Sequence, residues 1–365
     1  MFFSLSTQQD KNFVHHYQLP NGLILSTDDG WSHATVTDHM VLYKGYVNHC
    51  KLEDCMEDLL LQTNPEYKGN FCAFIASNSS VRLVHDASRA FPLWLSDNCL
   101  TNLHEGTEQI WSDCLLTINK DFTVDRQYFH PYTKVIGTLT EEQVIQTLHD
   151  TLCTTVEQFL SHNTKPLKVF LSGGIDTTTA WAYVDYFTKD YELIDYQYIK
   201  YTPFYKLNSG RLKQFWGYNQ IHLWEDDCVL VTGGNGDENM LRGPNTLAMV
   251  LDYYNLTFEE ILNPEDYHYT YYLKKKIEVQ LADDVFDQVL SMNVNDYQHW
   301  HLDKTLTFTP FKDISLLETI VAADKDLIVK QTKDAYINKE LINKLDPTKL
   351  NKLSNQKNFN MLENL

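Results

Sequence analysis

Residues 167–177 read Leu-Lys-Val-Phe-Leu-Ser-Gly-Gly-Ile-Asp-Thr, and most of the architecture can be worked out from this stretch. Its first five residues form a short, mainly apolar run of the kind that makes a buried strand. Gly173 and Gly174 permit a sharp turn, and apolar residues then recur at helical spacing through Ala180, Tyr183 and Val184. A strand, a glycine turn and a helix in direct succession predict one unit of an α/β sheet.

The turn itself has the composition of an anion-binding loop. Glycine N–H groups can approach a phosphate closely at the positive end of the following helix. Ser172 and Thr177 add hydroxyl groups, and the carboxylate of Asp176 makes sense beside a phosphate if it holds Mg²⁺. The lysine of a Walker A loop is absent, so a P-loop NTPase is not expected. A plain strand–turn–helix joint is the alternative interpretation, because glycine pairs alone are weak signals.

Strands and helices alternate around this loop. Thr140 and Gln143 form a capping box, followed by an amphipathic helix of about five turns. Further strands are expected at 193–199, 221–224 and 228–231, and the chain from Leu247 onward is mainly helical. For residues 136–365 this pattern predicts a doubly wound parallel sheet with a helical C-terminal part.

Residues 1–135 have a different character, which predicts a separate α+β domain. A polar helix is expected at 52–62, and the domain boundary is placed between 132 and 139. Short apolar segments punctuated by Asn, Asp, Gly and Ser predict strands at 23–26, 41–47, 71–76, 81–85 and 93–95.

Composition excludes several classes of protein. The formal charge is −19, which disfavours binding to nucleic acid or anionic membranes, and the run Lys274–Lys276 is interpreted as a solvated helix end. The seven cysteines contain no CxxC pair, which argues against a disulfide framework and a zinc ribbon and favours reduced core cysteines. No signal peptide or membrane-length apolar run is evident, so a soluble, cytoplasmic protein is expected.

A second glycine-rich turn follows the strand expected at 228–231. Residues 232–238 read Thr-Gly-Gly-Asn-Gly-Asp-Glu, followed by Leu241-Arg242-Gly243. Alone, such a turn could be a surface turn or a helix start. Its place after a later strand of the same sheet would bring Asp237 to the edge that carries Asp176.

The two motifs together resemble the PP-loop ATP pyrophosphatases, and most closely the asparagine synthetase-like members. The resemblance rests on Ser-Gly-Gly-x-Asp-Thr and on Gly-x-Gly-x-Asp-Glu-like turns. It implies that Asp176 and Asp237 bind Mg²⁺, and that Asp176 also takes part in catalysis. It further implies that ATP is held by Ser172, Gly173, Gly174, Asp176, Thr177, Gly233 and Gly234.

Residues 1–135 resemble a class II glutamine amidotransferase domain of αββα, Ntn-like fold. The resemblance rests on residues 43–48, 68–74 and 85–94. Such a domain needs an N-terminal Cys after removal of Met1, but residue 2 is Phe2, which has no nucleophile. The oxyanion-hole Asn is replaced by Lys44. These departures, similar to those of β-lactam synthetase-like relatives, predict a degenerate domain without glutaminase activity.

The synthetase half also departs from the family. Where relatives carry a Glu or Tyr that helps to deprotonate the amine, this chain has Gly234, and neither Glu238 nor His222 is a convincing replacement. Residues 310–313 resemble the family's Pro-Phe-x-Asp segment. Lys357 lies where the family has a catalytic, phosphate-contacting Lys, and Lys333 is a weaker candidate for that role.

The resemblance implies an ATP-dependent ligase that adenylates a carboxylate and joins it to an amine or to ammonia. The expected ligands are ATP, Mg²⁺ and small-molecule carboxylate and amine substrates, without nucleic acid or membrane, and a homodimer is compatible with the family. Two alternatives remain open: a PP-loop enzyme that modifies a nucleotide or tRNA, and a non-catalytic asparagine synthetase-like binding protein.

Overall fold

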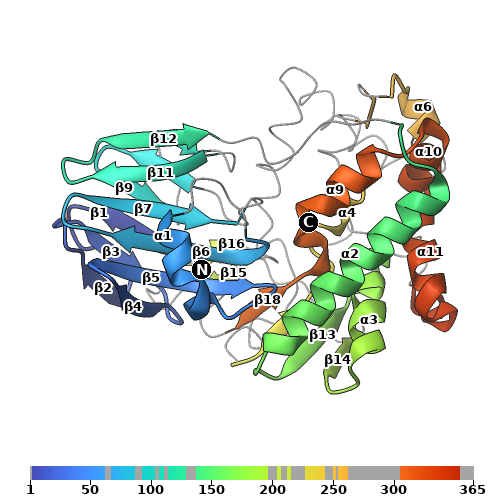
Figure 1. The fold of residues 1–365 in the computed structure, drawn as a ribbon, viewed down its shortest axis with the longest axis horizontal. Helices are drawn as coiled ribbons and strands as arrows, with labels where there is room; N and C mark the ends of the chain where they lie inside the picture. Colours follow the sequence, from blue (N-terminus) through green and yellow to red (C-terminus); the bar gives the residue numbers. More distant parts are fainter. Residues whose placement is uncertain are drawn as a thin grey trace.

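A computed structural model describes most of the chain as a mixed α/β protein with several sheets (Figure 1). An N-terminal lobe (residues 2–128) and a C-terminal lobe (residues 137–353) lie side by side. The described residues are 2–61, 67–86, 93–102, 107–110, 114–128, 137–195, 204–206, 212–214, 227–242, 250–251, 254–261 and 305–353.

The N-terminal lobe contains two antiparallel six-stranded sheets. The first has the order β10-β8-β9-β1-β3-β2, with β10 at Glu108–Ile110, β8 at Leu93–Ser96, β9 at Cys99–Thr101, β1 at Phe3–Ser6, β3 at Ile24–Thr27 and β2 at His15–Gln18. The second has the order β12-β11-β7-β6-β5-β4, with β12 at Val124–Tyr128, β11 at Cys114–Asn119, β7 at Ser80–His85, β6 at Gly69–Ala76, β5 at His39–Val47 and β4 at Ser32–Val36.

Alternation along the strands explains how these sheets pack. On β5 and β6, Leu42 and Phe74 belong to an apolar cluster that also contains Phe3 and Leu25 of the other sheet. The opposite face of β5 and β6 packs against η1 (Leu52–Cys55) and α1 (Met56–Leu61), through residues such as Met56. The lobe thus has two sheets and one outer helical layer of the expected αββα arrangement; the other outer layer stays a prediction.

The C-terminal lobe is built on a parallel sheet of order β14-β13-β17-β18. Its strands are β14 (Glu192–Asp195), β13 (Leu167–Leu171), β17 (Val229–Val231) and β18 (Leu306–Phe308). The chain beyond Leu247 was predicted to be mainly helical, and β18 was not among the predicted strands; it is only three residues long and includes the polar Thr307. The strand expected at 221–224 lies outside the described residues. A separate pair, β15 (Phe204–Lys206) and β16 (Leu212–Gln214), is antiparallel.

Helices cover one face of the parallel sheet, and their apolar residues form one cluster with Val169 and Val231. The helices are α2 (Glu141–His162), α3 (Ile175–Phe187), α9 (Ile314–Val321), α10 (Lys325–Asp334) and α11 (Tyr336–Leu345). The capping box of α2 at Thr140 and Gln143 is present as predicted. On the other face, Phe170 and Leu230 join the apolar cluster of the N-terminal strands. Double winding therefore stays a prediction, because this second face has no helical layer in the part of the chain that the structure describes.

Short elements complete the C-terminal lobe. They are α4 (Gly236–Asn239), α6 (Phe258–Ile261), η6 (Pro310–Lys312) and η7 (Pro347–Lys352). Lys349 of η7 is buried, with its ammonium 2.7 Å from Asp185 and over the ring of Trp181, so this segment is anchored on α3.

The two lobes are joined by charged contacts around η6. The ammonium of Lys312 lies 2.8 Å from Asp86 and 3.0 Å from the side-chain oxygen of Asn70, and both ion-pair partners are 3% exposed. Lys68 pairs with Asp313 at 2.9 Å. Because buried charges require close partners, these contacts fix η6 against the N-terminal lobe.

One expectation about the cysteines was wrong. Cys50 and Cys55 form a disulfide, whereas Cys72, Cys99, Cys114, Cys153 and Cys228 carry thiols. A separation of five residues carries no sequence signal that distinguishes paired from reduced cysteines.

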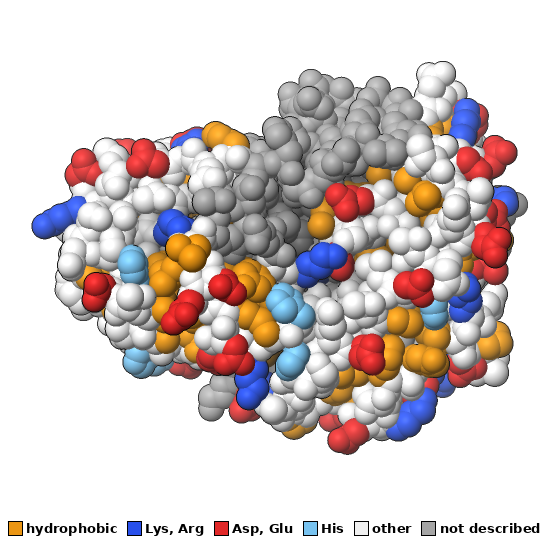
Figure 2. All heavy atoms as spheres, in the orientation of Figure 1, with side chains coloured by type: hydrophobic (Ala, Val, Ile, Leu, Met, Phe, Trp, Pro, Cys, Tyr) orange, Lys and Arg blue, Asp and Glu red, His pale blue; other side chains and the backbone are white. Residues whose placement is uncertain are grey.

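The surface agrees with the acidic composition. Figure 2 shows acidic side chains spread over both lobes of one face, with lysines and arginines between them. None of the helices in the described ranges combines the length and the apolar character needed to cross a bilayer. The boundary predicted at 135/136 lies outside the described residues.

Candidate functional site

The loop between β13 and α3 is closed by its own side chains. The hydroxyl of Thr177 donates to the carbonyl of Gly174 at 3.0 Å and lies 3.1 Å from the hydroxyl of Ser172. Ser172 in turn accepts from the N–H of Gly174 at 3.2 Å. Gly173 has a φ of +79°, in the left-handed region that favours glycine. The loop therefore has a defined shape, set by the hydroxyl residues and the glycines that the sequence singled out.

The second turn, between β17 and α4, packs directly on the first. A Cβ at Gly233 would lie 2.4 Å from the backbone nitrogen of Thr177, and one at Gly236 would lie 2.5 Å from the side chain of Asp176. Any larger residue would force the turns apart. Gly234 is held through its backbone, since its N–H donates to Thr232 and its carbonyl accepts from Thr309. ATP contacts by Gly233 and Gly234 stay a prediction.

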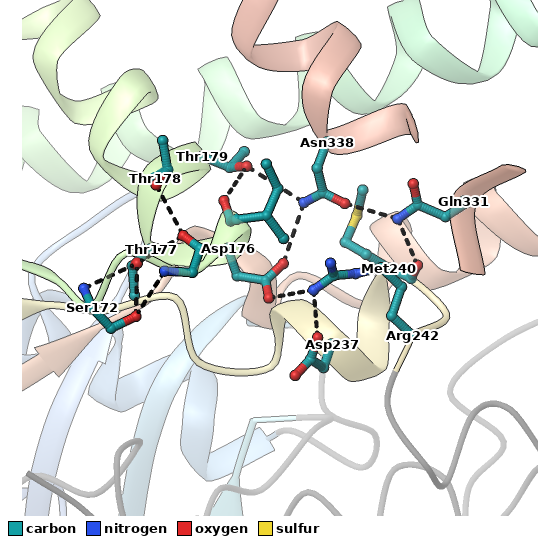
Figure 3. Close-up of polar contacts among 12 residues, drawn as sticks. Ser172, Asp176, Thr177, Thr178, Thr179, Asp237, Met240, Arg242, Gln331 and Asn338 are labelled. Atoms are coloured by element: carbon teal, nitrogen blue, oxygen red, sulfur yellow. Dashed lines mark hydrogen bonds and ion pairs between the residues drawn. The ribbon is translucent and has the colours of Figure 1, made fainter. Parts of the chain in front are cut away.

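This packing brings Asp176 and Asp237 together around one cation, Arg242 (Figure 3). The Nη2 atom of Arg242 lies 2.6 Å from Oδ2 of Asp176 and also contacts Oδ1 of Asp237. Asp176 and Arg242 side chains are each 14% exposed, whereas Asp237 is 52% exposed. The two carboxylates that the sequence paired are therefore neighbours, and one side of the pair is open to solvent.

A buried amide network holds the other side of Asp176. The side-chain nitrogen of Asn338, on α11, lies 3.3 Å from Oδ1 of Asp176 and 3.4 Å from the hydroxyl of Thr179. Gln331, on α10, donates to the side chain of Asn338 and to the carbonyl of Met240 (Figure 3). Both amides are fully buried, so they fix the orientation of Asp176 relative to the second turn.

The electrostatics of the pair follow from this setting. Burial raises the pKa of the Asp176 carboxyl above its usual range; Arg242 opposes this shift, and the nearby Asp237 adds to it. A positive charge beside Asp176 therefore stabilises the ionised form of its carboxyl group.

The donor set fits a magnesium ion. Mg²⁺ prefers carboxylate oxygens and usually binds proteins through one or two of them, together with water and substrate phosphates. Asp176 and Asp237 already share one nitrogen of the Arg242 cation, and the Asp237 side chain is 52% exposed. These two residues would hold the ion.

Sequence reasoning placed some residues well and missed others. Ser172, Gly173, Gly174, Asp176 and Thr177 lie in one loop, and Gly233, Gly234 and Asp237 lie in the turn packed against it. Lys357 and His222 lie outside the described residues. The roles of Arg242 and Asn338 were missed: Arg242 stood in the quoted motif without a role, and Asn338 carries no local signal.

The N-terminal lobe has a closed polar cluster where a glutaminase nucleophile would be expected. Phe2 is 1% exposed, and its backbone N–H donates to Asp28 at 3.0 Å. Lys44 lies 3.1 Å from Asp28 and donates to the carbonyl of Asp29 at 2.5 Å. The Lys44 and Asp28 side chains are 1% and 9% exposed, so this charge pair is sealed.

Comparisons with known proteins add little. No family model matches the chain, and no curated protein matches it. Among solved structures, a similar chain is glutamine phosphoribosylpyrophosphate (PRPP) amidotransferase from B. subtilis, complexed with ADP and GMP, at 9% identity and a TM-score of 0.23. The match covers 68% of this chain and 70% of that chain. At this TM-score the likeness carries no argument about the site.

Proposed function

We propose that the protein is an ATP-dependent, AMP-forming amide ligase. The proposal rests mainly on one observation. Asp176 and Asp237 follow neighbouring parallel strands, and both contact the same nitrogen of Arg242. Ligands of open parallel sheets bind at the carboxyl ends of the strands. The adjacent loop offers glycines and hydroxyl groups suited to phosphates.

The residues have distinct roles in this proposal. The loop from Ser172 to Thr177 would hold the β- and γ-phosphates, which leave together as pyrophosphate. Asp176 and Asp237 would hold Mg²⁺, which supplies positive charge for the phosphate oxygens. A substrate carboxylate attacks the α-phosphate, giving acyl-AMP and pyrophosphate; an amine or ammonia then displaces AMP to form the amide.

The N-terminal lobe would not supply ammonia from glutamine. A glutaminase of the expected class needs a nucleophile at residue 2 and an open site around it. Phe2 is buried there, and the sealed Lys44–Asp28 pair lies against it. The nitrogen would therefore come from an amine substrate or from free ammonia.

An ATP–pyrophosphate exchange assay tests the proposal directly. The protein is incubated with ATP, Mg²⁺, labelled pyrophosphate and a panel of carboxylic acids, including amino acids and dicarboxylic acids. We expect exchange that depends on one class of acid. Folded protein that supports no exchange with any acid in a broad panel would count against the ligase.

A non-catalytic nucleotide-binding protein is the second candidate, and one contact favours it. Arg242 occupies the position between the two acids that a metal ion would take in a ligase. Calorimetry separates the candidates: tight ATP binding without acid-dependent exchange would favour the binding protein.

A further inference from the structure

One nitrogen of Arg242 lies between the two carboxylates of the proposed metal site. Both contacts, to Oδ2 of Asp176 and to Oδ1 of Asp237, are made by Nη2 (Figure 3). A guanidinium more commonly forms parallel bonds from two nitrogens to one carboxylate. Here the two N–H bonds of one nitrogen, Nη2, serve two different carboxylates, so a single cationic group holds both acids.

The backbone keeps this cation attached to the second turn. The N–H of Arg242 donates to the carbonyl of Asp237 at 2.6 Å, and the preceding residue, Leu241, has a φ of +56°. The position of Arg242 relative to Asp237 is thus set locally. The Arg242 side chain is 14% exposed, and solvent reaches the contact from the side of Asp237, which is 52% exposed. Because the backbone bond to Asp237 does not involve the guanidinium, a change in the side-chain dihedral angles of Arg242 would separate the guanidinium from the acids while this bond remains.

We propose that Arg242 is an exchangeable built-in cation that keeps free divalent ions out of the Asp176–Asp237 pair until a nucleotide arrives. A divalent ion entering the pair would lie beside the guanidinium, and the two positive charges would repel each other strongly at that distance. The phosphates of a bound nucleotide give the guanidinium new anionic partners, so the acids are released for the metal. The inference rests on the proposed function for the assignment of this pair as the metal site.

The decisive experiment measures Mn²⁺ binding without nucleotide, by electron paramagnetic resonance, in the full-length protein and in Arg242→Gln. We expect Arg242→Gln to bind Mn²⁺ at least about tenfold more tightly than the wild type, because the competing charge is removed. Arg242→Lys retains a cation and should stay close to the wild type. The double variant Asp176→Asn/Arg242→Gln should lose the gain. Equal or weaker Mn²⁺ binding by folded Arg242→Gln overturns the proposal.

A second measurement uses the wild type alone, so it does not depend on whether a variant folds. Mn²⁺ is titrated with and without α,β-methylene ATP, which resists cleavage between the α- and β-phosphates; Mn²⁺ held by the analogue itself is subtracted with a protein-free control. We expect the analogue to tighten binding of Mn²⁺ to the protein at least about tenfold. Unchanged Mn²⁺ affinity overturns the proposal. Neither measurement involves adenylation, so absent pyrophosphate exchange would reject the ligase and leave this result standing.

Discussion

The two lobes each contain a carboxylate paired with a basic side chain, and the two pairs differ in access to water. In the N-terminal lobe, Lys44 and Asp28 are 1% and 9% exposed. In the C-terminal lobe, Arg242 and Asp176 are each 14% exposed, and the third member, Asp237, is 52% exposed. Ion pairs of the same kind are therefore sealed at Lys44–Asp28 and lie at an accessible edge around Arg242.

The difference indicates what each pair can do. A sealed ion pair cannot exchange partners, because separating it would leave an uncompensated charge in the interior. An accessible pair can accept a phosphate or a metal ion in place of one partner. Burial, rather than residue type, therefore distinguishes a structural contact from a candidate binding site in this molecule.

The largest expected effect comes from removing the less exposed acid of the C-terminal pair, Asp176. Asp176→Ala should lower acid-dependent ATP–pyrophosphate exchange by about 10³-fold or more, since the site loses charge next to the reacting phosphates. Asp190→Ala, at an exposed position soon after α3, is the matched control and should retain exchange. Full exchange by Asp176→Ala would remove this carboxylate from the site.

Breaking the sealed pair should mainly affect stability. Lys44→Met leaves Asp28 buried without its cation, so the free energy of unfolding should fall by about 3–5 kcal/mol. Arg242→Met should cost clearly less, because the raised pKa of Asp176 lets that carboxyl take up a proton. Urea unfolding of both variants at neutral pH makes the comparison. Equal losses would contradict the distinction between the pairs.

Disturbing the close packing of the two glycine turns should lower stability by less than breaking the sealed pair does. Gly233→Ala places a Cβ against the backbone of Thr177 and should destabilise the protein by about 1–3 kcal/mol. Gly174→Ala meets only the hydroxyl of Ser172, at 3.3 Å, and should cost less than about 1 kcal/mol. Thermal melting distinguishes the two, and a reversed order would show that the turns do not pack as described.

The sealed pair also predicts a pH dependence. Burial alone would raise the pKa of Asp28, but the Lys44 ammonium and the Phe2 N–H outweigh it and hold the pKa below its usual value. A lowered folded-state pKa contributes stability above the unfolded value of about 3.9, and this stability is lost as the pH falls through the folded value. Asp28→Asn/Lys44→Met should flatten this part of the curve, by at most about 1.4 kcal/mol per pH unit. Urea unfolding from about pH 6 to pH 2 measures it; an unchanged slope would contradict the assignment.

An exposed ion pair, Arg126–Glu108, adds a third case to the comparison and has the smallest expected effect on stability. Arg126 makes two contacts with Glu108, at 2.6 and 2.7 Å, but the side chains are 27% and 48% exposed. Arg126→Ala should lower the free energy of unfolding by only about 0.2–1 kcal/mol, and less in high salt. A loss as large as that of Lys44→Met would show that geometry outweighs burial.

Local signals explain which elements the sequence predicted. Residues 167–171 were expected as a strand and 140–143 as a capping box, and both are present because a few adjacent residues determine them. Strand β18 was missed because three residues, one of them Thr307, give no periodic pattern.

The parts of the site that the sequence did not predict depend on contacts between residues far apart in the chain. Arg242 and Asp176 are 66 residues apart, and Asn338 and Asp176 are 162 apart. The motifs predicted that Asp176 and Asp237 would be neighbours because both follow parallel strands. Nothing in the motifs specified that a guanidinium would lie between the acids, since that depends on the path of the chain after α4.

The segment from β18 to η6 has a consequence for the modularity of this protein. Thr309 binds the carbonyl of Gly234 in the second turn, and three residues later Lys312 pairs with Asp86 of the N-terminal lobe. A fragment that comprises only the C-terminal lobe would leave Lys312 without Asp86, three residues from the Thr309 hydroxyl that supports Gly234. Because Phe170 and Leu230 also pack on the N-terminal strands, the two lobes are expected to depend on each other for folding.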